Sequence, residues 1–108
     1  MTDKIFERKI DETCRISNEI KALHDDNEKY KDISLHVLLQ ALYFLHVEQG
    51  IVVEPEKLLD LAKPYTEEYI DERAKTCMNG RLDAYSETIA ELCDKYKPHV
   101  KFVNLFKR

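Results

Sequence analysis

The stretch ISLHVLLQALYFLHVEQG, residues 33–50, is the most apolar part of a strongly charged chain. Its leucines gather on one side of an α-helix, because they recur mostly at steps of three and four residues: Leu35, Leu38, Leu39, Leu42 and Leu45. That side is widened around the helix by Val37, Ala41 and Phe44. The strip left for water is narrow and consists of His36, Gln40 and Tyr43. A helix that is apolar over most of its circumference needs protein neighbours on more than one side.

This stretch therefore predicts a central helix over about 35–49. Asp32 or Ser34 can cap its N-terminus, and Gly50 can supply the left-handed residue that ends it. Burying a leucine or phenylalanine contributes roughly 1.5–3 kcal/mol. Leaving the whole apolar side in water would therefore cost more than the stability of a typical domain allows.

The remaining sequence favours helices as well. Only two glycines and three prolines interrupt the 108 residues, too few for a many-turned β fold. We expect further helices over about 3–29, 55–63, 65–78 and 82–97, each offering an apolar stripe. The clearest stripe recurs at steps of three and four residues and consists of Leu82, Tyr85, Ile89, Leu92 and Tyr96.

The sequence thus predicts an all-α fold, a small bundle of four to five helices packed around the central apolar helix. We expect residues 1–108 to form a single helical domain. Residues 98–108 form a basic and aromatic tail whose pattern fits a strand or a helical turn equally well.

The covering of the central helix has two alternatives. The other helices can surround it, or it can meet a second copy of the chain, as can the stripe of 82–97. A short chain with a modest core gains much from burial in a homodimer. The sequence leaves both alternatives open.

Charge divides the chain into an acidic body and a basic end. Residues 1–94 carry 12 basic and 21 acidic side chains, a net charge of −9, and residues 95–108 carry five basic side chains and no acid. The N-terminal segment MTDKIFERKIDE is too charged for a secretory signal. The apolar run of 33–47 is shorter than the roughly 20 residues that a membrane-spanning helix needs. With three cysteines outside any CxxC spacing, we expect a cytoplasmic protein with free thiols.

No pattern of catalytic or metal-binding residues is present in the sequence. No His–His, His–Cys or Glu-x-x-His pair occurs at the spacing of a metal site on a helix. His46 is interpreted as a core or boundary histidine, and Cys14, Cys77 and Cys93 as small apolar residues near apolar stripes. Glu68 and Glu72 lie one helical turn apart and are interpreted as part of a solvated face. We therefore predict no catalytic site, no cofactor and no metal, and hence a protein that is not an enzyme.

Two surfaces are candidates for binding a partner. Residues 54–72 hold seven acids against Lys57 and Lys63, a charge that suits a basic groove on a target protein. The same acids oppose a helix-turn-helix interpretation of 35–63, because they would face DNA phosphates. The tail interleaves cations with aromatic rings, a combination that suits nucleic acid as well as protein. The predicted partner-binding residues are Glu54, Glu56, Asp60, Glu67, Glu68, Asp71, Tyr96, Lys97, Lys101, Phe102, Phe106 and Lys107.

The sequence therefore predicts a small non-enzymatic regulator, adaptor or inhibitor that acts through protein–protein contacts. The first alternative is a regulatory protein that binds nucleic acid through its tail. The second is an enzyme or a metal-binding helical bundle, for which the sequence offers no convergent set of ligands.

Overall fold

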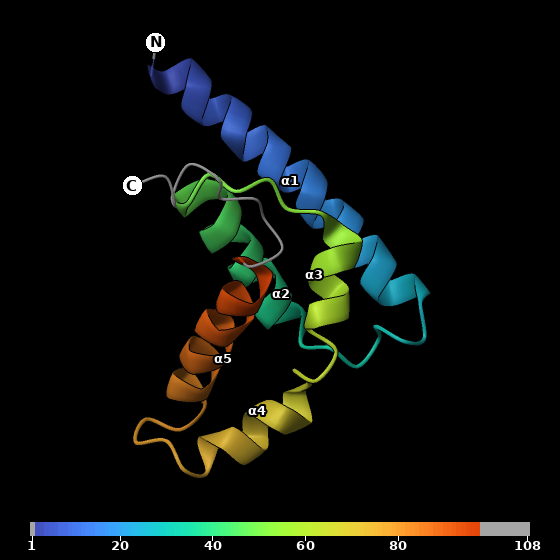
Figure 1. Cartoon of the computed structure of the whole chain (residues 1–108), viewed down its shortest axis with the longest axis vertical. Helices are drawn as coiled ribbons and strands as arrows, with labels where there is room; N and C mark the ends of the chain where they lie inside the picture. The colour runs from blue at the N-terminus through green and yellow to red at the C-terminus, as the bar shows by residue number, and fades with distance from the viewer. Residues whose placement is uncertain (1, 98–108) are drawn as a thin grey trace, which may run out of the picture.

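The computed structural model describes the backbone of residues 2–97 and the side chains of residues 10–97. Within that range the fold is all-α, as predicted (Figure 1). The helices are α1 (Thr2–Asp26), α2 (Leu35–Tyr43), the π-helical turn η1 (Phe44–Glu48), α3 (Pro55–Leu61), α4 (Glu67–Ala74) and α5 (Arg81–Tyr96). The β-type pairing in the described range is one isolated antiparallel bridge between Ile33 and Thr66.

The central position of α2 is confirmed. Its buried residues are fully covered by neighbours and consist of Val37, Leu38, Ala41 and Leu42. α1 and α5 pack directly against α2, whereas α3 packs against α1 and α5. α4 packs mainly on α5 (Figure 1). The expectation that the other helices offer their stripes to the central helix therefore holds for α1 and α5, whereas α3 packs mainly on α1 and α5, and α4 mainly on α5.

Local sequence explains both ends of the central segment. The hydroxyl of Ser34 accepts a hydrogen bond from the Val37 amide at 3.3 Å, so Ser34 is the N-cap. Gly50 has a φ of 67°, and beyond this left-handed residue the Ile51 amide returns to the Leu45 carbonyl at 2.8 Å. The predicted helix of 35–49 is not α-helical throughout, because it becomes a π-turn at Phe44, where the Gln49 amide donates to the Phe44 carbonyl at 3.1 Å.

The stripe predicted on α5 is confirmed except at its first member. Leu92 and Tyr96 are buried and Tyr85 and Ile89 are partly buried, but Leu82 is 74% exposed. Leu82 lies in the first turn of α5, directly after the corner at Gly80, where no element of the described range covers it. The spacing of apolar residues along α5 does not show how far the neighbouring elements that cover this stripe extend.

α4 is shorter than the predicted helix of 65–78. Thr66 caps it by accepting from the Tyr69 amide at 3.0 Å. After Ala74 the amides of Lys75, Thr76 and Cys77 each bond to the carbonyl three residues earlier, which is the tighter pattern of a 3₁₀ turn. No helix within residues 2–97 is long and apolar enough to cross a lipid bilayer.

Candidate interaction surfaces

The acids predicted on α3 are exposed. The carboxylate of Asp60 accepts a hydrogen bond from the Tyr30 hydroxyl at 2.6 Å and lies 3.8 Å from the ammonium of Lys63. Burial of Tyr30 and its bond to Asp60 raise the pKa of the phenol to about 12. The carboxylates of Glu56 and of Glu54, the N-cap residue of α3, form no hydrogen bond or ion pair with any described residue. The N-terminal end of α3 therefore presents two carboxylates that no lysine or arginine of the described residues neutralises.

The acids predicted on α4 have a different environment. Glu67 accepts hydrogen bonds from the Ser34 hydroxyl and from Arg81, each at 2.7 Å, and from the Tyr85 hydroxyl. Partial burial opposes ionisation of Glu67, but these three donors together hold the pKa of its carboxyl below the usual range. Asp71 pairs with the same Arg81.

Of the six predicted acids, the structure brings Glu67 and Asp71 together around one arginine. Glu68 is exposed and, within residues 10–97, has neither a hydrogen bond nor an ion pair. α3 and α4 are separate arms joined by residues 62–66 (Figure 1). Among the six predicted acids, those that have no cation beside them within residues 10–97 are therefore Glu54, Glu56 and Glu68.

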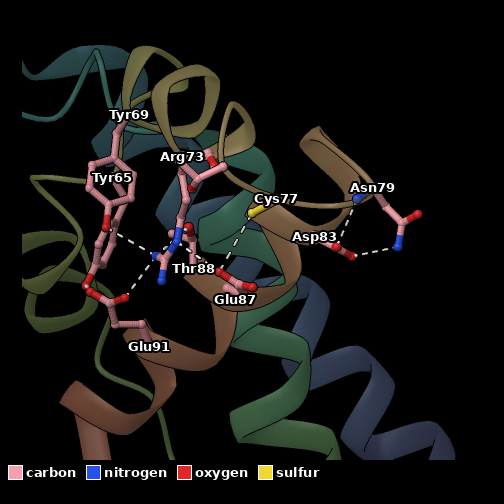
Figure 2. Close-up of polar contacts among 10 residues, drawn as sticks. Tyr65, Tyr69, Arg73, Cys77, Asn79, Asp83, Glu87, Thr88 and Glu91 are labelled. Carbon is pink, nitrogen blue, oxygen red and sulfur yellow. Dashed lines mark hydrogen bonds and ion pairs between the residues drawn. The ribbon is translucent and has the colours of Figure 1, made fainter.

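A second polar cluster ties α4 to α5 (Figure 2). The Arg73 guanidinium donates to Glu91 at 2.9 Å, to Glu87 at 3.2 Å and to the Thr88 hydroxyl at 3.3 Å. Glu91 also accepts from the Tyr65 hydroxyl at 2.8 Å. The bond from Tyr65 and the pairing with Arg73 lower the pKa of Glu91 in spite of its partial desolvation. The cluster pairs a fixed cation with ionised acids and ties α4 to α5. The Cys77 thiol lies at its edge, 3.9 Å from a carboxylate oxygen of Glu87, and desolvation together with this acid raises the pKa of the thiol.

The described part of the predicted C-terminal contact surface differs from the expectation. Tyr96 is 2% exposed, and its hydroxyl accepts from the Glu54 amide at 2.8 Å and lies 3.4 Å from the Val52 carbonyl. Its ring is therefore part of the core and does not present a surface to a partner. The ammonium of Lys97 lies 5.7 Å from the centre of the Phe44 ring. The other predicted tail residues, Lys101, Phe102, Phe106 and Lys107, lie outside the described residues.

The sequence did not reveal a face formed by α1, α2 and α5. One groove, with a volume of about 370 Å³, lies between α2–η1 and α5 and is lined by Gln40, Tyr43, Phe44, Glu48, Ser86, Ile89, Ala90 and Cys93. A second groove of about 360 Å³ lies between α1 and α2 and is lined by Thr13, Cys14, Ser17, Leu39, Gln40, Leu42 and Tyr43. Tyr43 lines both grooves and is 46% exposed, and Phe44 is 37% exposed.

The sequence contained a partial signal for this face. Gln40 and Tyr43 belong to the predicted wet strip, and both are exposed as expected. Phe44 was assigned to the covered side, but one side of its ring borders the groove beside α5. The grooves depend on the distances of α1 and α5 from α2. The spacing of apolar residues within one helix does not predict these distances.

The remaining titratable candidates do not form a metal site among the described residues. No group of three histidine, cysteine or acidic side chains there could hold a metal ion. His46 is 5% exposed, as expected for a core or boundary residue, and its Nε2 lies 3.4 Å from a carboxylate oxygen of Glu12 without forming a hydrogen bond. Burial raises the pKa of the Cys93 thiol to about 11. Cys14 lines a groove beside Leu39 and Leu42, near apolar residues as predicted, but it is exposed, so its interpretation as a buried apolar residue is wrong.

Scans against protein-family models, curated proteins and solved structures found no match to this chain.

Proposed function

We propose that this protein is a small, non-enzymatic, cytoplasmic regulator, adaptor or inhibitor that acts by contact with another protein. The acids of α3 and of the first turn of α4 would enter a basic groove on that target. The observation that carries the proposal is the unneutralised set Glu54, Glu56 and Glu68, which stands exposed while neighbouring acids are paired with cations.

Charge of this kind favours encounter with a basic surface. A field of one sign accelerates association with a partner of opposite charge and disfavours wrong partners. The basic groove would supply the cations that the chain itself does not place beside these three carboxylates.

The position of α3 supports the proposal further. Pro55 starts the helix, the Glu54 amide is bonded to the buried Tyr96, and Asp60 is bonded to the buried Tyr30. These anchors hold the backbone beneath Glu54 and Glu56 in one arrangement before any partner arrives. A preorganised surface loses less conformational entropy on binding than a mobile one.

The test is quantitative capture of the target from the source cells with two variants of equal charge. The first is Glu54→Gln/Glu56→Gln/Glu68→Gln, and the control is Asp11→Asn/Glu19→Gln/Asp26→Asn, which changes three exposed acids of α1. We expect the first variant to lose at least about tenfold of the captured protein, a loss typical of removing several interface charges. The control should retain it, and added salt should weaken wild-type capture. Equal capture by both variants would contradict the proposal.

Binding of nucleic acid through residues 98–108 is the second candidate, supported by the five basic side chains of residues 95–108. Titration of labelled DNA and RNA at low and moderate salt tests it. Binding that weakens steeply with salt would favour this function, and no binding at low salt would remove it.

A further inference from the structure

The groove between α2–η1 and α5 has a mainly apolar lining. Its apolar lining residues include Tyr43, Phe44, Ile89 and Ala90, and Glu48 is the charged one among its described lining residues. Both aromatic side chains are exposed. Exposed aromatic rings with few charges around them are typical of a surface that another segment of protein covers.

Exposed apolar side chains also lie at the C-terminal end of α5, where the described part of the chain ends. The ammonium of Lys97 lies 5.7 Å from the centre of the Phe44 ring. The carbonyl of Val52, whose side chain is 75% exposed, lies 3.4 Å from the Tyr96 hydroxyl. Residues 98–108 are therefore attached to α5 beside exposed apolar surface.

The attachment point and length of residues 98–108 are sufficient for them to reach along the groove. Lys97 follows Cys93, the last α5 residue of the lining, by one helical turn. Ser86, the first α5 residue of the lining, is about 16 Å from Lys97 along the helix axis. Eleven extended residues span up to about 35 Å. Pro98 has no amide hydrogen with which to extend α5, so the segment can turn and run back along the groove.

The composition of residues 98–108 matches this groove. Five of them are apolar: Val100, Phe102, Val103, Leu105 and Phe106. The charged ones are all basic: Lys101, Lys107 and Arg108. Basic side chains suit Glu48, which is exposed and has no ion pair or hydrogen bond with any described residue, and the acidic body of 1–94. A second copy of the chain, with its net charge of −4, would be repelled from the same place.

We infer that residues 98–108 occupy the groove between α2–η1 and α5 as an intramolecular cover, with apolar side chains on the lining and basic side chains toward Glu48 and the acidic body. Attachment to α5 makes weak contacts sufficient. A short tether gives an effective concentration on the order of 1 mM, so a segment with a dissociation constant of about 0.1 mM would occupy the groove about nine-tenths of the time.

The inference goes beyond the proposed function and does not depend on it. Glu54, Glu56 and Glu68 do not line this groove, so a docked tail leaves those carboxylates available to a target. The aromatic rings of a docked tail are withheld from nucleic acid, which stacks on such rings. Docking and binding of nucleic acid through the tail therefore compete.

Thiol modification of the full chain carrying Ala90→Cys, with each site resolved by mass spectrometry, tests the inference. Ala90 is exposed on the α5 wall of the groove, and Cys14, which lines the groove between α1 and α2, is the internal reference. The native tail is compared with Phe102→Ser/Leu105→Ser/Phe106→Ser, which keeps its charge. In that variant the thiol at position 90 should react about tenfold faster, the factor that nine-tenths occupancy implies, and Cys14 should react at an unchanged rate.

Two further variants complete the experiment, and far-UV circular dichroism establishes that each variant is folded. Ser86→Cys is a second reporter at the other end of the groove, where the side chain is also exposed, and it should show the same acceleration. His99→Ser/Asn104→Ser is the control within the tail, because it changes polar residues and keeps every apolar one. It should leave both reporter thiols protected.

The inference is overturned if both reporter thiols react equally fast with the native and the triple-serine tail. Acceleration of Cys14 to the same extent would also overturn it, because the substitutions would then loosen the whole fold. Protection that grows with protein concentration would assign the groove to a second copy of the chain instead of the tail.

Discussion

Three buried tyrosines determine much of how the helices are joined. Tyr30, Tyr65 and Tyr96 are each at most 2% exposed, yet each hydroxyl reaches a polar partner at the edge of the core. These partners are Asp60 on α3, Glu91 on α5 and the backbone of residues 52–54. A tyrosine thus contributes the apolar area of its ring and a directional bond from its tip, which fixes the position of a neighbouring element.

Tyr30 gives a prediction at alkaline pH. Its pKa is raised from the ordinary 10.0 to about 12 by burial and by its bond to Asp60, so the folded state holds the proton more tightly than the unfolded state does. The corresponding stability is fully present below about pH 10 and is lost as the pH rises through about 12, amounting to about 2–3 kcal/mol. Urea unfolding between neutral pH and pH 12 should show this loss in the wild type.

In Tyr30→Phe the alkaline loss of unfolding free energy should be smaller by about 2–3 kcal/mol, because the titrating phenol is absent. The variant should also be less stable at neutral pH by about 1 kcal/mol, the typical contribution of one hydrogen bond. An identical alkaline decline in wild type and variant would show that Tyr30 is not the group responsible.

At the scale of single elements, α4 depends on polar ties more than the other helices do. It has eight residues and one buried side chain, Ile70. Isolated helices of this length are unstable in water. Arg73 supplies the compensating contacts to Glu87, Thr88 and Glu91 of α5.

Arg73→Met should therefore loosen α4 selectively. Methionine keeps much of the apolar stem but leaves Glu91 without its cation, at a cost of about 1–3 kcal/mol. Hydrogen exchange should show faster exchange of the α4 amides, with a smaller change in α2. Lys75→Met on the same helix is the control, because both Lys75 and its partner Glu72 are about 70% exposed, and such pairs contribute about 0–1 kcal/mol. Equal acceleration of α4 exchange in the two variants would contradict the assigned role of Arg73.

The elements also show what a sequence can and cannot encode. Ser34 and Gly50 could be identified because a cap and a left-handed turn are local features, decided by a few neighbouring residues. The inward side of α2 could be identified because leucine spacing is local as well. The π-turn at Phe44 and the end of α4 at Ala74 could not, because no glycine or proline stands next to either residue to mark the change.

The candidate sites follow the same division. Sequence showed that Glu54 and Glu56 are acidic and exposed, since no apolar pattern includes them. It could not show that the carboxylate of Glu67 accepts hydrogen bonds from Ser34, Tyr85 and Arg81, which lie far from it in the sequence. The grooved face of α1, α2 and α5 was missed for the same reason, because its grooves exist only once the three helices are packed together.

At the scale of the whole molecule, one continuous core joins elements from α1 to α5. Residues of α1, α2, α3, α4 and α5 belong to a single buried cluster, and Leu38 is fully buried within it. A defect at the centre of such a cluster should reduce the stability of the fold as a unit and not that of one helix.

Leu38 and Leu82 both belong to apolar stripes predicted from the sequence. Truncating each of them to alanine distinguishes a defect in the core from the general effect of shortening a leucine. Leu38→Ala leaves a cavity in the core and should lower the free energy of unfolding by about 2–5 kcal/mol, a large part of the 5–15 kcal/mol typical of a domain. Leu82→Ala changes a side chain that is 74% exposed and should stay within about 0.5 kcal/mol. Urea titration followed by far-UV and by tyrosine near-UV dichroism should give coincident transitions for both variants. A large loss for Leu82→Ala would mean that this residue is covered in solution, and separate transitions for Leu38→Ala would mean that the core is not shared by all the helices.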